Sequence, residues 1–231
     1  MLQLTDRDTK FWAPDQNVID VICSKLAPDA KVLEIGPGLA PFPRANVSVD
    51  LKDFGKVHTE RMDLNEMLLP YGDKEFDFVY ARHVLEDMYN PFLLCLEMSR
   101  VAKAGYLETP SPLAEFCRGV DGGSPPWRGY NHHRYIVWPK NGVLQFIGKF
   151  PCIEYVGMKP AEEWDYMVAL SKGSDAWNTR FYWEGQIKYK HWQCPQDFLL
   201  PTDYQRMITM AITDWMQENK LSQSQPCFWR K

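Results

Sequence analysis

The stretch KVLEIGPG, residues 31–38, is a short apolar run that ends in two glycines. A run of this length, closed by a turn signal, is typical of a buried strand. Gly36 and Gly38 flank Pro37 and allow close approach of a ligand to the backbone, because a glycine carries no Cβ atom. The stretch therefore predicts a strand followed by a ligand-binding loop.

An acid closes the next predicted strand, NVSVDL (46–51). The carboxylate of Asp50 at a strand tip is suited to accept hydrogen bonds from both hydroxyls of a ribose. Helical spacing predicts helices over 17–26, with Asp15 as N-cap, and over 91–102. Further strands are predicted near 57–64, 75–84 and 104–110. This alternation indicates an α/β protein with a Rossmann-like, mostly parallel sheet flanked by helices.

The second half of the chain differs in character. Residues 111–131 are rich in glycine and proline, and a hairpin is predicted from 133–138 and 143–150 around the Asn141-Gly142 turn. We expect helices near 160–172 and 202–219, and a second hairpin over 180–192 that turns at Glu184-Gly185. The sequence thus predicts one domain over 1–231, with hairpin insertions after the fifth strand and a substrate-side insert over 111–160.

Composition excludes several classes of protein. The net charge of −4 argues against a non-specific nucleic-acid binder, which needs a basic surface. The sequence contains no run of 18 apolar residues, so we expect no membrane span. Residues 1–12 lack the apolar region of a secretory signal. The six scattered cysteines form no C-x-x-C pair, so we expect no metal site and reduced thiols in a cytoplasmic protein.

Several motifs follow one another in a characteristic order and spacing: EIGPG (34–38), VD (49–50), MDL (62–64), FDFV (76–79), HVLE (83–86) and SRVAKAG (99–105). In these motifs the chain resembles the class I S-adenosylmethionine-dependent methyltransferases from residue 30 to about residue 110. The resemblance implies S-adenosylmethionine as cofactor and S-adenosylhomocysteine as product.

The resemblance also implies roles for individual residues. The loop around the methionine part of the cofactor corresponds to Glu34, Gly36, Pro37 and Gly38. The ribose site corresponds to Asp50 with Leu51, and the adenine site to Asp63 with Leu64. Residues near the sulfonium and the acceptor correspond to Arg82 and His83, and His83 is a candidate base.

The chain departs from the family pattern at three places. Ala40 replaces the third glycine, and Asp87 stands where histidine is common. Only eight residues, 39–46, separate Gly38 from Val47, which is too few for the usual crossover helix. The carboxylate of the cofactor would then lose part of its helix-terminus cradle, and Arg44 is either a replacement or an ordinary surface arginine.

Residues 111–138 leave the carboxyl edge of the predicted sheet, where ligands bind in this class of fold. Residues 111–150 hold five Lys or Arg and two Asp or Glu, a local balance of +3. We predict acceptor contacts from this segment and a base at His133, although a solvated hairpin rimmed by arginines remains the alternative. The predicted acceptor contacts are Trp127, Arg128, Tyr130, His132 and Arg134.

Adjacent histidines on a strand point to opposite faces, so His132 and His133 are not expected to share a metal ion. We expect a methyltransferase acting on a small molecule, with the hydroxyl of an anionic glycan or nucleotide-sugar as the candidate acceptor and no nucleic-acid or membrane partner. A non-catalytic module that binds the same cofactor remains open, and an NAD-dependent oxidoreductase is disfavoured by the short spacing to Asp50.

Overall fold

The computed structural model describes residues 13–122, 127–157 and 160–222. These residues form two compact units. The first, here called the sheet unit, contains Ala13–Thr109 and Arg180–Lys188. The second, called the hairpin unit, contains Pro110–Thr179 and the described residues from Tyr189 onward. Each unit is described by itself below.

The sheet unit is built on six strands in the order β3-β2-β1-β4-β5-β8. The strands are β1 (Val32–Ile35), β2 (Val47–Asp50), β3 (Thr59–Arg61), β4 (Phe76–Arg82), β5 (Ala102–Pro110) and β8 (Asn178–Glu184). The first five are parallel along the ladders β3·β2, β2·β1, β1·β4 and β4·β5. β1 is buried at all four residues, as expected for a strand covered on both faces. The predicted Rossmann-like sheet is confirmed.

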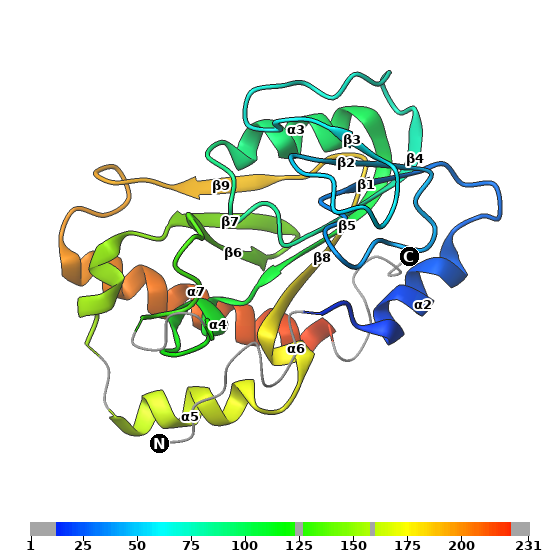
Figure 1. The fold of residues 1–231 in the computed structure, drawn as a ribbon. Coiled ribbons are helices and arrows are strands. Elements are labelled where there is room, and N and C mark those ends of the chain that lie inside the picture. Colours follow the sequence, from blue (N-terminus) through cyan, green and yellow to red (C-terminus); the bar gives the residue numbers. More distant parts are fainter. Residues whose placement is uncertain (1–12, 123–126, 158–159, 223–231) are drawn as a thin grey trace. The chain divides into compact units, whose positions relative to one another are not determined.

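Two helices cover the strands of this unit. α2 (Gln16–Lys25) begins at the predicted N-cap, where the Asp15 side chain accepts from the Asn17 N–H. α3 (Pro91–Val101) begins with proline at its first position, after the cap Asn90. In Figure 1, α2 and α3 lie on opposite sides of the strands. Each helix thus buries its apolar face against one side of the sheet.

The connection from β1 to β2 contains no helix over residues 36–46, which confirms the prediction from its length. The side chain of Phe42 is 3% exposed and belongs to an apolar cluster that also contains Ile19 and Ile22 of α2. Its ring stacks on Tyr80 with centroids 4.3 Å apart, and Tyr80 in turn stacks on Tyr106 at 5.4 Å. The helix-free connection is therefore packed onto β4 and β5 through aromatic rings.

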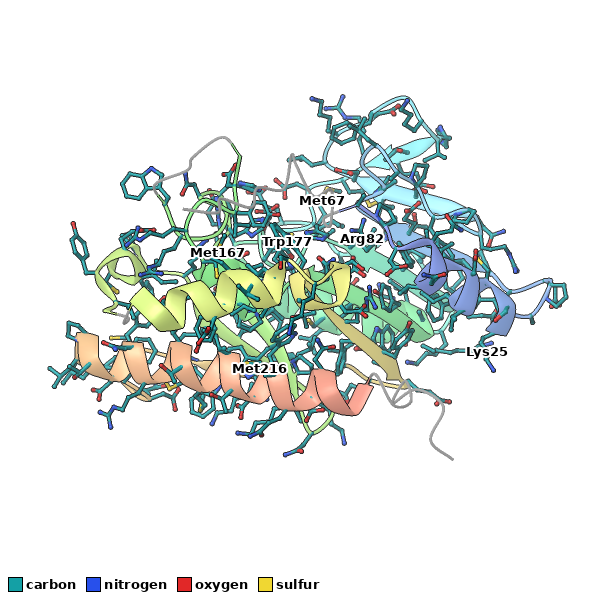
Figure 2. All side chains as sticks on the ribbon, turned by 90° about the horizontal axis from the view of Figure 1, so that it is seen from below. Lys25, Met67, Arg82, Met167, Trp177 and Met216 are labelled. Carbon is teal, nitrogen blue, oxygen red and sulfur yellow. The ribbon has the colours of Figure 1, made fainter. Side chains whose placement is uncertain are left out.

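The hairpin unit holds a three-stranded sheet in the order β6-β7-β9. β6 (Tyr135–Lys140) and β7 (Val143–Gly148) form the predicted antiparallel hairpin, with positive φ at Asn141 and Gly142 in its turn. The helices are α4 (Pro112–Phe116), α5 (Pro160–Leu170), α6 (Ser174–Trp177) and α7 (Pro201–Ser222), with a 3₁₀ helix at Pro151–Tyr155. Met167 and Trp177, labelled in Figure 2, belong to the core of this unit.

The predicted second hairpin over 180–192 is wrong. β8 joins the six-stranded sheet next to β5, whereas β9 (Tyr189–Trp192) pairs in parallel with β7. The Glu184-Gly185 turn is held instead by the sheet unit, since the Gly185 N–H donates to the Lys103 carbonyl at 2.7 Å. Ile187, in the link between β8 and β9, is 1% exposed. Burial of this link is therefore favoured over direct pairing of the two strands.

The predicted single domain over 1–231 with an insert over 111–160 stays a prediction. Five described cysteines are free thiols, and Cys227 lies outside the described residues. Among the described residues, none of the helices combines the length and the apolar character that crossing a bilayer requires.

Candidate cofactor and acceptor sites

The loop after β1 has the backbone that its glycines predict. Gly36 has φ +71°, and a Cβ atom there would lie 2.5 Å from Cγ2 of Val84. A Cβ atom at Gly38 would meet no atom within 4 Å. The Gly36 N–H donates to the Val49 carbonyl at 2.9 Å, which ties the loop to β2. The loop is therefore tightly held at Gly36 and open at Gly38.

Glu34 is hydrogen-bonded to residues that follow this loop in the chain. Its side chain, 1% exposed, accepts from the Phe42 N–H at 2.6 Å through Oε1 and from the Ser48 hydroxyl at 3.1 Å through Oε2. Burial raises the pKa of Glu34 to about 7, against the lowering effect of these two donors. Because both oxygens are engaged by the chain, Glu34 shapes the loop and the helix-free connection.

Two acids follow neighbouring strands at the same edge of the sheet. Asp50 is the last residue of β2, pairs with Arg61 in the ladder, and accepts from the Lys52 N–H at 3.1 Å through Oδ1 alone. Asp63 follows β3 and accepts from the Asn65 backbone and side chain through Oδ1. No hydrogen bond within the described part of the chain uses Oδ2 of either acid. The two carboxylates are thus held in place, each with an oxygen to offer a ligand.

The apolar residues beside these acids differ in exposure. Leu51 is 62% exposed and Leu64 only 7%. Leu51 therefore presents an apolar surface to solvent next to the ribose-binding candidate, whereas Leu64 packs into the unit.

Charged side chains gather where β4 and β5 end. Arg82 Nε donates to Glu108 Oε1 at 2.7 Å, and the Tyr106 hydroxyl donates to the other oxygen of Glu108. Burial would raise the pKa of Glu108, but Arg82 and His83 lower it. His83 follows β4 at φ +51°, and its Nδ1 lies 3.3 Å from Glu86 Oε1. Arg82 is thus committed to Glu108, and His83 lies between two carboxylates.

Residues 30–107 match the family described as "Methyltransferase domain". The match runs from β1 into β5 and contains the glycine loop, Asp50, Asp63, Arg82 and His83, but it ends before Glu108. Residues 30–107 are thus similar to methyltransferase domains. The domains of this family use S-adenosylmethionine as the methyl donor.

Solved structures similar to the chain include other methyltransferases. A putative methyltransferase of an antibiotic biosynthesis pathway in Anabaena variabilis is 17% identical, with 47% of this chain and 53% of that chain covered and a TM-score of 0.36. A putative methyltransferase of Bacillus halodurans is 22% identical over 42% and 51% of the chains, with a TM-score of 0.32. The chain spans about half the length of these structures. No curated protein matches it.

The methyltransferase domain fits its donor at two observable points. Open space beside Gly38 leaves room for a ligand against the loop backbone, and the Asp50 carboxylate stands at the tip of the adjoining strand. Asp50 would hold the ribose and Asp63 the adenine amino group, each as a hydrogen-bond acceptor. The methyl group itself comes from the donor, which carries it on a positively charged sulfur.

A second cluster lies within the hairpin unit. Glu115 of α4, 1% exposed, binds His133 Nδ1 at 2.5 Å and Lys149 Nζ at 2.6 Å, one on each carboxylate oxygen. Lys149 also donates to the Tyr130 carbonyl at 2.6 Å. Burial alone would raise the pKa of Glu115, but Lys149 and His133 lower it to about 2. Glu115 is therefore an ionised acceptor with a cation and an imidazole as its partners.

The backbone at Gly129 makes this cluster possible. A Cβ atom at Gly129, φ +55°, would lie 2.6 Å from the Cα, carbonyl and carboxylate atoms of Glu115. The Gly129 N–H donates to the Cys117 carbonyl at 2.9 Å. Only glycine allows the chain to cross Glu115 at this distance.

A cavity of about 620 Å³ opens beside this cluster, entirely within the hairpin unit. His133 and Lys149 are among its lining residues. Exposed aromatic side chains also line it: Trp127 is 49% exposed, Phe150 41% and Tyr155 89%. The volume lies in the range of small-molecule sites.

The structure assigns other roles to several predicted acceptor contacts. Arg128, 4% exposed, donates to the Phe116 and Val156 carbonyls and lies over the Phe116 ring at 4.2 Å. The hydroxyl of Tyr130 accepts from Trp177 Nε1 at 3.0 Å. Arg134 donates to the His132 carbonyl at 3.2 Å. These three side chains are used by the unit's own fold.

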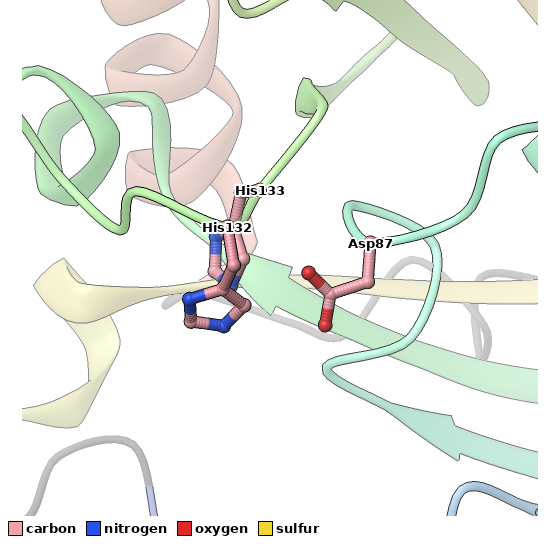
Figure 3. A group of neighbouring side chains, drawn as sticks. All are labelled: Asp87, His132 and His133. Atoms are coloured by element: carbon pink, nitrogen blue, oxygen red, sulfur yellow. The ribbon is translucent and has the colours of Figure 1, made fainter. Parts of the chain in front are cut away.

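The expectation that His132 and His133 point to opposite faces is wrong. His132 lies in a turn and His133 directly follows it, both before β6 begins at Tyr135. Their rings meet edge to face with centroids 4.4 Å apart, and Figure 3 draws both side chains. The figure also draws Asp87, which belongs to the loop after β4 in the sheet unit.

Sequence reasoning missed Glu115, Lys149, Glu86 and Glu108 as members of charged clusters. The available signal was a charged residue inside an apolar run, as in PLAEF (112–116) and HVLED (83–87). Burying a charge is costly without a partner, so such positions suggest a partner or a ligand.

Proposed function

We propose that this chain transfers the methyl group of S-adenosylmethionine to a hydroxyl group of a small molecule. The observation that carries the proposal is the glycine loop, open at Gly38, beside the Asp50 carboxylate on the adjoining strand. A loop that exposes its backbone next to a ribose-binding acid is the arrangement that holds nucleosides in parallel α/β sheets.

The donor is held by the methyltransferase domain. Asp50 accepts from the ribose hydroxyls through a carboxylate, and such charge-assisted bonds contribute about 1.5–3 kcal/mol each. Asp63 accepts from the adenine amino group. Glu34 acts indirectly, because it holds Phe42 and Ser48 and through them the connection that frames the loop.

The acceptor is activated by His133. A carboxylate with a pKa of about 2 accepts hydrogen bonds only, so Nδ1 of His133 carries the proton that it shares with Glu115. In the neutral form of this tautomer the lone pair is on Nε2, the nitrogen suited to take a proton from an acceptor hydroxyl. Lys149 is a second partner of Glu115, on its other carboxylate oxygen. General base catalysis of this kind contributes typically about 10²–10⁴-fold.

The lining of the cavity favours an uncharged part of the acceptor. Arg118 is paired with Glu154 at 2.8 Å, Lys149 with Glu115 at 2.6 Å, and Arg128 donates to carbonyls. The local positive charge is thus used within the unit, while aromatic faces are exposed at the cavity. We therefore propose a hydroxylated ring, such as the sugar of a glycan or nucleotide-sugar, bound through its apolar faces and its hydroxyls.

Calorimetry with S-adenosylhomocysteine tests the proposal. We expect binding to the wild type and at least tenfold weaker binding to Asp50→Ala. Asp53→Ala is the matched control, because the Asp53 carboxylate is exposed and caps its own turn at the Gly55 N–H. Equal affinities for a folded Asp50→Ala protein and the wild type would show that the ribose is held elsewhere. Binding without methyl transfer to any sugar acceptor would identify a non-catalytic module instead.

A further inference from the structure

Glu86 is a buried carboxylate with no hydrogen bond. Its residue is 1% exposed, and neither carboxylate oxygen has a hydrogen-bond partner among the described residues. His83 Nδ1 lies 3.3 Å from Oε1 in a geometry that forms no hydrogen bond. Because a buried charge is unfavourable without a partner, the Glu86 carboxylate is suited to interact with a cation.

The neighbouring charges do not supply that cation. Arg82 is paired with Glu108 at 2.7 Å. Arg180 is paired with Asp15 at 2.9 Å, and its Nε lies 3.7 Å from Glu108. Two arginines thus face two carboxylates in this part of the sheet unit. Glu86 is a further carboxylate of this unit, and no lysine or arginine among the described residues forms an ion pair with it.

The loop that carries Glu86 packs against the donor loop. Val84, two residues before Glu86, has its Cγ2 atom 2.5 Å from where a Cβ of Gly36 would lie. The His83 N–H donates to the Glu108 carbonyl at 2.8 Å, which holds the start of this loop at the end of β5. The unmatched carboxylate therefore belongs to the donor side of the methyltransferase domain.

We propose that Glu86 makes the domain select the positively charged sulfonium of S-adenosylmethionine over the neutral thioether of S-adenosylhomocysteine. The inference rests on the proposed function. In the reaction the acceptor oxygen forms a C–O bond with the methyl carbon and its proton passes to the base. The C–S bond breaks and its electron pair stays on sulfur, so the positive charge leaves the donor side. Glu86 then favours donor binding and product release through one Coulombic contribution.

The test compares two ligands on two proteins by calorimetry. The wild type should bind S-adenosylmethionine more tightly than S-adenosylhomocysteine. In Glu86→Gln, which preserves the shape and removes the charge, the ratio of the two dissociation constants should fall about tenfold, mainly through weaker binding of S-adenosylmethionine. Glu66→Gln is the matched control, because Glu66 is an exposed acid of the same domain and its charge is screened by water and salt.

The thermal midpoint without ligand gives a second readout. Replacement of a carboxylate that is hydrogen-bonded within the fold lowers the midpoint, whereas replacement of Glu86, which accepts no hydrogen bond from the described residues, should raise it. An equal change in both dissociation constants, or a lower midpoint with an unchanged ratio, overturns the inference and leaves the proposed function standing. A wild type that prefers S-adenosylhomocysteine overturns it without any variant. A wild type that binds neither ligand overturns the proposed function as well.

Discussion

The molecule contains two buried carboxylate–histidine pairs, one in each unit, and they differ in how completely they are bonded. Glu115 binds His133 at 2.5 Å and Lys149 at 2.6 Å, so both of its oxygens are satisfied. Glu86 lies 3.3 Å from His83 and accepts no hydrogen bond from the described part of the chain. The protein satisfies both oxygens of the first carboxylate, whereas the described residues give the second no hydrogen bond.

Glu34 stands between these two cases. Its oxygens are satisfied, but by a backbone N–H and a hydroxyl instead of a cation. The three acids therefore form a series. Glu115 has a cation as partner, Glu34 has neutral donors, and Glu86 has no hydrogen-bond donor among the described residues. The pKa values of the first two acids differ accordingly: that of Glu115 is lowered to about 2, and that of Glu34 is raised to about 7. This series predicts how each acid contributes to stability.

The largest effect is expected at Glu115. Glu115→Ala leaves the Lys149 side chain, 6% exposed, without its carboxylate, and removal of one partner of a buried pair costs about 3–5 kcal/mol. Urea unfolding should show this loss. Lys103→Ala breaks the exposed pair with Asp77 and serves as control, with a loss of about 1 kcal/mol or less. Similar losses in the two variants would contradict the contrast between buried and exposed pairs.

Acid unfolding sharpens the same contrast. Because the pKa of Glu115 is lowered from 4.5 to about 2 in the fold, its contribution is present above pH 4.5 and is lost as the pH falls toward 2. At about 1.4 kcal/mol per pKa unit, this contribution is on the order of 3 kcal/mol. Urea unfolding of Glu115→Gln between pH 5 and pH 2 should therefore show a shallower loss of stability than the wild type. Parallel curves would mean that Glu115 is not ionised in the fold.

The pH dependence of Glu34 should have the opposite sign. Its pKa is raised from 4.5 to about 7, so its contribution is present below pH 4.5 and is lost as the pH rises through 7. Glu34→Gln keeps an acceptor for the Phe42 N–H and should flatten the decline between pH 5 and pH 8 by about 1–3 kcal/mol. Urea midpoints at both pH values measure this, with Glu60→Gln as a control acid. A steeper decline in the variant would refute the assignment.

The smallest effect concerns proton positions alone. Nitrogen-15 spectra of histidine-labelled protein should show His133 with a protonated Nδ1 and an unprotonated Nε2 at pH 8. The reason is that the nitrogen of His133 that contacts the Glu115 carboxylate is Nδ1. His83 is the internal comparison, because no hydrogen bond to Glu86 fixes its tautomer. A His133 ring protonated only at Nε2 would remove it as the base.

The structural features that depend on residues close together in the sequence could be predicted. The apolar runs of β1 and β4, the capped helix α2 and the Asn141-Gly142 turn follow from local patterns and occur as predicted. Even the absent helix between β1 and β2 follows from a count of residues. The predicted second hairpin failed because Gly185 is held by Lys103, 82 residues earlier in the chain.

The candidate sites show the same limit. Strand tips predict the position of Asp50 and Asp63, because parallel strands end at one edge. By contrast, Glu115 meets Lys149 across 34 residues, and no local pattern links an acid in a short helix to a lysine beyond a hairpin. The turn at His132 and His133 was likewise hidden, because β6 begins two residues later than the pattern suggested.

The helix-free connection has a consequence for how the domain folds. In most crossovers a helix can form early from local hydrogen bonds and guide the next strand into place. Here residues 36–46 have no such element, and Phe42 is held by Glu34 of β1 and by the ring of Tyr80 of β4. We therefore expect the pairing of β1 with β2 to depend on β4, which comes later in the sequence. Among the ladders of this sheet, we expect β1·β4 to form first during folding.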